Sequence, residues 1–94
     1  MLVVTRYRVE GSGGEVFRRD AASALAILSH CTGYLDGVIG RNVDDPGLWT
    51  LTTRWRDVGS YRRALSSYDG KVSAVPLLSR AIPEPSAYEV LETY

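Results

Sequence analysis

The sequence is poor in the residues that most often identify a reaction or a compartment. It holds one cysteine, Cys31, and one histidine, His30, among 94 residues. A single cysteine cannot form an internal disulfide, so nothing points to an oxidising compartment. One histidine, one cysteine and scattered carboxylates also fall short of the ligand set that zinc or non-haem iron needs. The sequence therefore predicts neither a disulfide scaffold nor a metal centre.

Net charge and long apolar runs are also missing. Eleven basic and eleven acidic side chains cancel to a formal charge of zero, which argues against a general affinity for nucleic acid or for anionic membranes. No apolar run approaches the roughly 18–20 residues of a membrane-spanning helix, and no signal-peptide core stands at the N-terminus. We therefore expect a cytoplasmic protein with no nucleic-acid or membrane partner.

Nucleophile and phosphate motifs are absent or incomplete. There is no GxSxG sequence, and Cys31 has no companion histidine at an informative position. The run Gly11-Ser12-Gly13-Gly14 lies between a predicted strand and a predicted helix, as a phosphate loop does, but it lacks the GxGxxG or GxxxxGKS spacing. We interpret it as a flexible connection. His30 is expected at a solvent edge near a helix end rather than as a general base.

The most informative stretch runs from residue 33 to residue 65. It predicts two strands, Tyr34–Asn42 and Leu48–Arg56, the second rich in tryptophan, threonine and leucine. The turn between them is Asp45-Pro46-Gly47-Leu48. Proline at its second position and glycine at its third predict a type II turn with a positive φ at Gly47.

The other elements follow from the spacing of apolar residues. In chain order they are a strand at Leu2–Val9, a helix at Glu15–Cys31, a helix at Ser60–Tyr68 and a strand at Ala87–Glu92. The first helix should stop before Gly33. Residues 71–80 are ambiguous, because Pro76 would have to occupy the first turn of a short helix or kink it.

The second predicted helix has a cap, a buried side and a stop. Asp57 or Ser60 is placed to cap its N-terminus, and Asp69-Gly70 is expected to end it. Four residues recur at spacings of three and four and are expected on its buried side: Val58, Tyr61, Leu65 and Tyr68.

The order strand, helix, strand, strand, helix, strand is that of the α+β split βαβ, or ferredoxin-like, fold. Right-handed crossovers place the first and third strands at the centre of a four-stranded antiparallel sheet, with both helices on one face. No repeat, linker or composition change divides the chain, so residues 1–94 are expected to form a single domain.

Two helices cover only one face of four strands. The other face carries either the tryptophan-bearing set or the set made up of Leu2, Val4, Leu48, Thr50 and Thr52. Neither set is polar enough to lie comfortably in water, and the chain is too short for a third layer. We expect a homodimer joined sheet to sheet; a monomer with a semi-polar open face is the alternative.

Arginine and aromatic side chains are the candidates for chemistry. Arginines share parity on two neighbouring predicted strands: Arg6, Arg8, Arg54 and Arg56. They either converge to orient a carboxylate or phenolate by bidentate bonds, or form surface ion pairs that contribute little. Asp36, Glu10, Glu89 and Glu92 are the available partners.

Large rings belong to the elements that enclose the space between sheet and helices: Tyr7, Trp49, Trp55, Tyr61 and Tyr68. They are either core or the walls of a pocket for a flat apolar ligand, held by stacking and phenolic hydrogen bonds. The Gly-aromatic motif of ferredoxin-like RNA-binding modules is absent, so an RNA-binding face is not expected.

One set of residues matches a family pattern: Gly33-Tyr34-Leu35, Arg41, Pro46, Trp55 and Tyr61. With the polar end of the first strand and the proline-flanked last strand that carries Tyr88, the chain resembles the antibiotic biosynthesis monooxygenase (ABM) family of dimeric α+β barrels over nearly its whole length. This pattern is informative about the fold more than about the activity.

The resemblance implies a cofactor-independent monooxygenase of small aromatic substrates, either phenolic or quinone-like, that needs no metal or flavin. The candidate catalytic residues are then Trp55, Tyr7 and Arg54, and the candidate substrate-binding residues are Tyr61, Trp49 and Tyr68. In that reading Trp55 and Tyr61 stack on the substrate, while Tyr7 or Arg54 stabilises its phenolate. The alternative is a non-catalytic dimeric protein of the same fold that binds a small ligand or has an accessory role.

The haem-degrading branch of the family is not expected. Its members use an asparagine on the first strand, and a tryptophan and a histidine on the second helix. In this chain the stretch 60–74 has neither, and Tyr7 stands where the asparagine would be.

Overall fold

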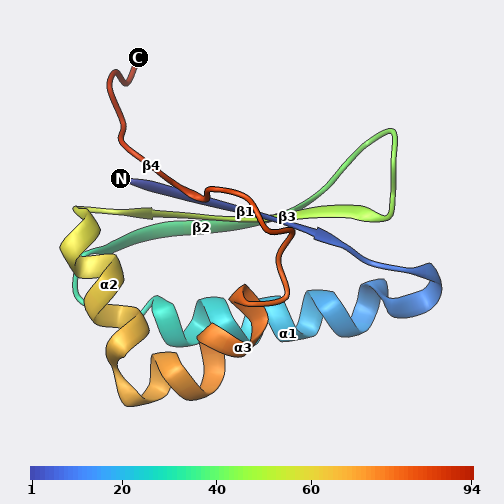
Figure 1. The fold of residues 1–94 in the computed structure, drawn as a ribbon, viewed down its shortest axis with the longest axis horizontal. Coiled ribbons are helices and arrows are strands. Elements are labelled where there is room, and N and C mark those ends of the chain that lie inside the picture. Colours follow the sequence, from blue (N-terminus) through green and yellow to red (C-terminus); the bar gives the residue numbers. More distant parts are fainter.

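The computed structural model describes residues 1–94 and contains a four-stranded antiparallel sheet with its helices on one face (Figure 1). The strands are β1 (Leu2–Arg8), β2 (Tyr34–Arg41), β3 (Leu48–Trp55) and β4 (Ala87–Tyr88). The helices are α1 (Gly14–Leu28), α2 (Val58–Ser66) and α3 (Val75–Leu78), with a 3-10 turn at Gly11–Gly13 and a π-helical turn at Gly70–Ala74. The strand order β2-β3-β1-β4 confirms the ferredoxin-like prediction.

The pairing of β1 with β3 settles which residues face the helices. Val3 lies opposite Thr53 and Tyr7 opposite Trp49, and all four are buried. The tryptophan-bearing face is therefore the covered one. The open face carries the other predicted set, whose members are only partly buried: Leu2, Val4, Leu48, Thr50 and Thr52.

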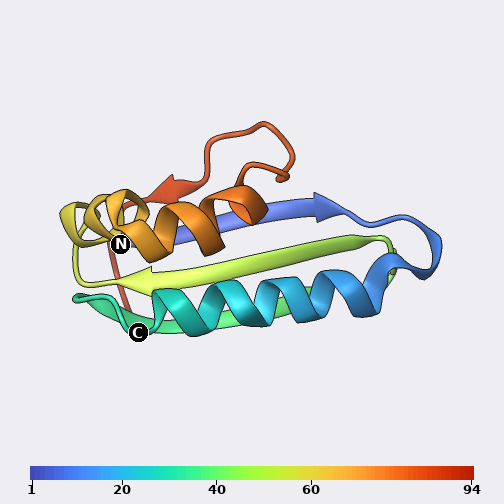
Figure 2. The same cartoon turned by 90° about the horizontal axis from the view of Figure 1, so that it is seen from below.

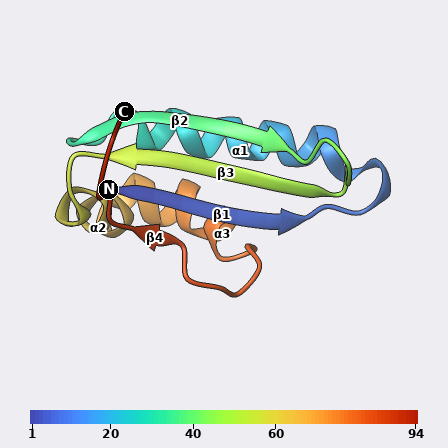
Figure 3. The ribbon, with the colours of Figure 1, turned by 90° about the horizontal axis from the view of Figure 1, so that it is seen from above.

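The core lies between the sheet and the helices. α1 runs along β2 and β3, while α3 lies on the β1 side (Figures 2 and 3). α1 buries the residues spaced three and four apart on its inner side: Phe17, Ala21, Ala24 and Leu28. Small residues here let the helix lie close to the sheet. None of the helices has the length and apolar character that crossing a membrane requires.

Glycines with a positive φ lie in two of the connections, between α1 and β2 and between β1 and α1. α1 ends at Leu28, short of the predicted Cys31, and Gly33 then adopts a φ of +90° that turns the chain into β2. Gly11 also has a positive φ, at the tip between β1 and α1. The run 11–14 is not a loose connection throughout, because its first three residues form a 3-10 turn and Gly14 begins α1.

The turn between β2 and β3 differs from the predicted one. The Leu48 N–H donates to the Asp45 carbonyl at 3.1 Å, which closes a β-turn. Gly47 does not have a positive φ, so the prediction of a type II turn is wrong. The physical reason is the Asp45 carboxylate, which accepts a hydrogen bond from the Gly47 N–H at 3.0 Å and favours a type I turn.

α2 begins at Val58, two residues before the predicted Ser60, and ends at Ser66, before the predicted Tyr68. The Asp57 carboxylate caps it by accepting from the Ser60 N–H at 2.8 Å. The helix stops at Ser67, whose backbone is extended, so the prediction that Asp69-Gly70 ends it is wrong. Gly70 instead lies inside the π-helical turn. A Cβ at this position would overlap the Ala64 carbonyl oxygen, so glycine permits the close approach of the two helical segments.

The buried side of α2 is also different from the predicted stripe. Ser60 and Ala64 are its buried residues, and Tyr61 is half-buried. Tyr68 is 80% exposed, because the helix breaks at Ser67 and the chain changes direction there. The expectation that Tyr68 is buried is therefore wrong. Val58, at the start of the helix, is 40% exposed.

β4 is much shorter than predicted. Only Ala87 and Tyr88 pair with β1, opposite Val3 and Leu2, so the prediction of a strand to Glu92 is wrong. After Tyr88 the chain leaves the sheet on the side away from the helices (Figure 1). The apolar residues of this tail are exposed: Val90, Leu91 and Tyr94.

Candidate functional site

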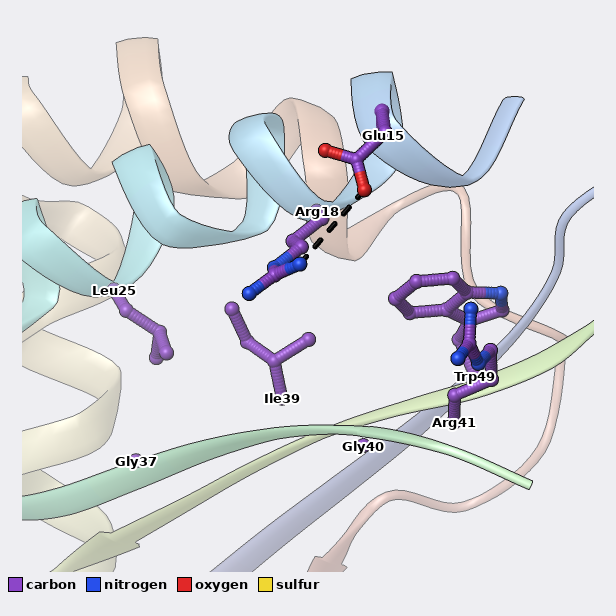
Figure 4. A pocket seen from close by; sticks show the side chains of 8 residues that line it. All are labelled: Glu15, Arg18, Leu25, Gly37, Ile39, Gly40, Arg41 and Trp49. Carbon is purple, nitrogen blue, oxygen red and sulfur yellow. Dashed lines mark ion pairs between the residues drawn. The ribbon is translucent and has the colours of Figure 1, made fainter. Parts of the chain in front are cut away.

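A cleft of about 430 Å³ opens between α1 and β2, at one edge of the sheet (Figure 4). Its lining comes from α1, β2 and the start of β3: Glu15, Arg18, Leu25, Gly37, Ile39, Gly40, Arg41 and Trp49. The volume falls within the range of small-ligand pockets, roughly 300–1,000 Å³. An apolar part and a charged part are both present, which suits a small ligand that is itself amphipathic.

A glycine of β2 keeps the floor of the cleft low. A Cβ at Gly37 would overlap the Tyr34 hydroxyl and lie 2.7 Å from Leu25 Cδ2. Gly40 has the opposite parity: a Cβ there would point to the open face of the sheet, 2.8 Å from the Thr50 hydroxyl oxygen, so Gly40 offers only its backbone to the cleft. The floor between Leu25 and Trp49 therefore consists of backbone and the Ile39 side chain.

Trp49 forms a fixed wall at one end of the cleft. Its Nε1–H donates to the Pro46 carbonyl at 3.1 Å, and its ring packs edge-on against Phe17 with centroids 5.3 Å apart. Gly14 gives the ring room, since a Cβ there would lie 3.1 Å from Trp49 Cζ2. The Arg41 guanidinium lies 5.4 Å from the ring centroid, in cation–π geometry.

Three charged side chains line the cleft: Glu15, Arg18 and Arg41. Glu15 and Arg18 form an ion pair at 3.8 Å, with the side chains 84% and 68% exposed, so this pair contributes little stability. Arg41 has no carboxylate within ion-pair distance. The cleft therefore has one more positive than negative charge, which favours an anionic group in it.

Of the six site residues predicted from the sequence, Trp49 lines this cleft. Tyr7 is 2% exposed and lies behind Phe17, with ring centroids 4.8 Å apart. Its hydroxyl shares a hydrogen bond of 2.9 Å with the Thr5 hydroxyl. Burial raises the pKa of the Tyr7 phenol, so this group is neutral at physiological pH.

Trp55 and Tyr61 belong to a second aromatic cluster. Trp55 is 1% exposed, its ring centroid lies 5.5 Å from that of Tyr61 and 5.3 Å from that of Tyr34, and its Nε1–H donates to the Thr53 hydroxyl at 2.9 Å. Burial raises the pKa of both tyrosines. These rings contact one another at the distances of a packed core, as in the first of the two interpretations offered by the sequence.

Arg54 and Tyr68 lie apart from both clusters. Arg54 is on the open face of the sheet, opposite Leu2, and its Nε–H donates to the Asp36 carboxylate at 3.1–3.2 Å. Tyr7 and Trp55 point to the other face. The structure therefore does not bring Arg54 together with Tyr7, and Tyr68 is exposed on the chain beyond α2.

The four strand arginines do not converge on one site. Each has its own carboxylate partner: Arg6 with Glu84 at 2.6 Å, Arg8 with Asp45 at 2.7 Å, Arg54 with Asp36 at 3.1 Å and Arg56 with Asp57 at 3.4 Å. The interpretation as surface ion pairs is confirmed, although only the partner of Arg54 is among the carboxylates that the sequence suggested.

His30 and Cys31 lie at the far end of α1 from Glu15, where they line a separate hollow with Arg63. His30 is exposed, as expected. The His, Cys, Asp and Glu side chains form no group of three or more that could hold a metal ion.

Sequence reasoning missed most of the cleft. Arg18 was not singled out, Glu15 was used only as the start of the first predicted helix, and Arg41 only as part of a family pattern. The available signal was the pair Gly37 and Gly40 inside a predicted strand, because glycine within a strand often marks a close approach of backbone or ligand.

The family model for antibiotic biosynthesis monooxygenase matches residues 1–71. SnoaB, a cofactor-independent oxygenase from Streptomyces nogalater, is 23% identical, with 98% of this chain and 96% of that chain covered and a TM-score of 0.74. Rv0793 from Mycobacterium tuberculosis is 14% identical, with 98% and 95% covered and a TM-score of 0.75.

A conserved protein from Methanosarcina mazei Go1 is 22% identical, with 92% of this chain and 84% of that chain covered and a TM-score of 0.72. No curated protein sequence matches the chain significantly. At these identities the structural likeness shows a shared fold.

Proposed function

The chain belongs to the antibiotic biosynthesis monooxygenase family, and from that premise we propose that it is a cofactor-independent monooxygenase of small phenolic or quinone-like aromatic substrates. The observation that carries the proposal is the cleft between α1 and β2, with its aromatic wall, apolar floor and charged rim. A fold shared with SnoaB, a cofactor-independent oxygenase, supports the same reaction class. That support is an analogy, whereas the cleft belongs to this chain.

The reaction proposed is one in which the substrate supplies the electrons. An anthrone loses a proton to give a delocalised oxyanion, which passes electrons to O₂ and forms a carbon–oxygen bond. Loss of water from the resulting hydroperoxide leaves the anthraquinone. The balance is anthrone plus O₂ to anthraquinone plus water: the methylene carbon gives up four electrons, one oxygen atom becomes the new carbonyl and the other becomes water.

The cleft offers a group for each part of this reaction. Glu15 is the carboxylate in the lining and is placed to accept the proton of the substrate. Arg18, 3.8 Å from Glu15, is placed to stabilise the oxyanion that remains. Trp49 and Ile39 hold the flat ring. In this proposal Tyr7 and Trp55 act through packing, because both are buried in the core.

Oxygen uptake with an anthrone or hydroquinone tests the proposal. The wild-type protein should consume O₂ faster than the uncatalysed background with no added metal or flavin. Ile39→Trp, which fills the cleft, should abolish this excess. Val16→Trp, which adds the same side chain to an exposed position of α1 outside the cleft, should retain it. Wild-type rates at background across a panel of such substrates would contradict the proposal.

We also propose that the working form is a homodimer joined through the open face of the sheet. That face carries partly buried apolar and threonine side chains, and Val38 on β2 adds a further apolar group that is 59% exposed. The tail after Tyr88 leaves on the same side (Figure 1), with Leu91 83% exposed. A second copy of the chain would cover both surfaces. A cytoplasmic location stays a prediction from the sequence.

A ligand-binding protein without turnover is the second candidate. It is favoured by one observation: Glu15 is the single acid–base group that lines the cleft, and it is largely exposed. This alternative predicts saturable binding of an aromatic ligand in the cleft with no O₂ uptake. The oxygen measurement above, made at ligand concentrations that saturate the cleft, separates the two.

A further inference from the structure

We propose that the cleft selects aromatic substrates that carry a carboxylate, and that Arg41 binds this acid group. The inference rests on the proposed function, because it names the substrate class of the same cleft. Its first support is that Arg41 is an unneutralised charge. Of the ten arginines, six have a carboxylate within 4 Å (Arg6, Arg8, Arg18, Arg54, Arg56 and Arg80), and Arg41 is the one of the other four that lines the cleft. Arg41 has none, so a carboxylate from a ligand would be its first.

The second support is that Arg41 is already oriented. Its guanidinium rests on the Trp49 ring at 5.4 Å, and Trp49 is itself held by the hydrogen bond to the Pro46 carbonyl. A guanidinium stacked on a ring keeps its in-plane N–H donors free, and two of them match the two oxygens of a carboxylate. An anchor that is ordered before binding loses little entropy when the ligand arrives.

The third support is the polarity of the cleft. Figure 4 shows Leu25 at one end, Ile39 in the middle and Trp49 with Arg41 at the other end, while Glu15 and Arg18 approach from α1. A ligand with an aromatic body and an acid group at its end matches this arrangement. Its ring lies over the apolar end and its carboxylate reaches Arg41. Glu15 does not oppose this anion strongly, because Arg18 lies 3.8 Å from it and offsets its charge.

Binding of a matched pair of probes tests the inference. 1-Naphthoic acid and 1-naphthamide have nearly the same shape, but only the first is an anion at neutral pH. We expect the wild-type protein to bind the acid about tenfold more tightly or better, as measured by titration calorimetry, since a charge-assisted hydrogen bond favours the acid by that order. Added salt should weaken binding of the acid and leave that of the amide unchanged.

Substitutions then assign the preference to one side chain. Arg41→Gln should bring the two affinities within about threefold of each other, since it removes the charge that discriminates between the probes. Arg41→Lys should keep part of the preference, because it keeps the charge and loses the bidentate fork. Arg19→Gln removes the same charge from α1 outside the cleft and should leave the preference intact. Unchanged near-UV circular dichroism in Arg41→Gln would show that the Trp49 wall is preserved.

Three results would overturn the inference: equal binding of the acid and the amide, an acid preference that survives in Arg41→Gln, or no binding of either probe. Oxygen uptake separates this failure from failure of the proposed function. If the protein consumes O₂ with a neutral anthrone but binds the acid and the amide equally, only the proposal that substrates carry a carboxylate is refuted. An acid preference that depends on Arg41, with no uptake from an anthrone carboxylic acid, supports the inference and refutes the oxygenase.

Discussion

Trp49 and Trp55 lie on the same face of β3, yet only Trp49 borders the cleft. Tyr34 and Tyr61 pack on Trp55 from two sides and leave it 1% exposed. At Trp49 the neighbouring strand residue is Arg41, whose long side chain lies across the ring and leaves space beyond it. The difference between a core residue and a wall residue is therefore made by the partners on β2 and α2.

Matched substitutions should distinguish the ligand-binding role of Trp49 from the structural role of Trp55. Trp49→Phe removes the hydrogen bond to Pro46 and the support under Arg41, so we expect weaker binding of an aromatic acid, seen as a higher KM or Kd. Trp55→Phe should lower the free energy of unfolding by about 1–3 kcal/mol, as for other core substitutions, and leave ligand affinity close to wild type. Calorimetry and urea unfolding on both variants test this. Equal loss of affinity in both would contradict it.

Tyr7→Phe tests whether the buried phenol has a catalytic role. The Thr5 hydroxyl would lose a partner at 2.9 Å but keep its bond to the Leu51 carbonyl at 3.2 Å. We expect the free energy of unfolding to fall by about 0.5–1.5 kcal/mol, while O₂ uptake stays close to wild type. A large loss of uptake with unchanged unfolding would instead support the sequence-based prediction that Tyr7 is catalytic.

The start of α2 depends on one carboxylate. Asp57 accepts from the Ser60 N–H, and this hydrogen bond holds the pKa of the carboxyl below its ordinary value. The folded state therefore favours the ionised form. This contribution to stability is complete above the unfolded pKa near 3.8 and is lost as the pH falls through the lower folded value.

Asp57→Ala should lower the thermal midpoint at pH 7, and the difference from wild type should narrow below about pH 4. Asp57→Asn keeps a side-chain oxygen for the cap and loses the charge, so it should be less destabilised at pH 7 and show no acid dependence from this position. Thermal unfolding between about pH 2 and pH 7 measures this. A difference that stays constant over the whole range would contradict the role of the carboxylate.

At the level of elements, the sequence was sufficient for the order of the four strands and the two longer helices, and it narrowed the cap of α2 to Asp57 or Ser60. It was not sufficient for the type of turn, because the Asp45 carboxylate and not Gly47 decides the backbone conformation there. Tyr68 is exposed because α2 breaks at Ser67, after which Gly70 approaches the Ala64 carbonyl and brings two helical segments together. Local spacing carries no information on that contact.

The cleft could not be predicted from the sequence for a similar reason. Arg41 lies next to Trp49 only because β2 and β3 pair in one particular register, with a bulge between Tyr34 and Asp36. A shift of a single residue would turn Arg41 to the open face of the sheet. The sequence assigned Tyr7, Trp49 and Trp55 to elements around the space between sheet and helices but left the facing side of the strands open, and which ring meets a cavity depends on helix placement.

For the whole molecule, the open face of the sheet is the surface that a second copy should cover. Light scattering at micromolar concentration should show about twice the 10.4 kDa of one chain. Thr52→Glu places a charge at the centre of this face, between Val4 and Val38, and should give the single-chain mass. Thr32→Glu adds the same charge at an exposed position off the sheet and should not. A wild-type protein of single-chain mass would refute the dimer.

The most direct test of the account follows the two indole N–H signals in a nitrogen-15 NMR spectrum during titration with 1-naphthoic acid. Each tryptophan gives one signal, and Trp49 borders the cleft while Trp55 lies in the core. We predict that the Trp49 signal shifts in a saturable manner and the Trp55 signal stays in place. A shift confined to Trp55 would place the ligand between the sheet and α2 and contradict the cleft; no shift of either signal would also contradict it.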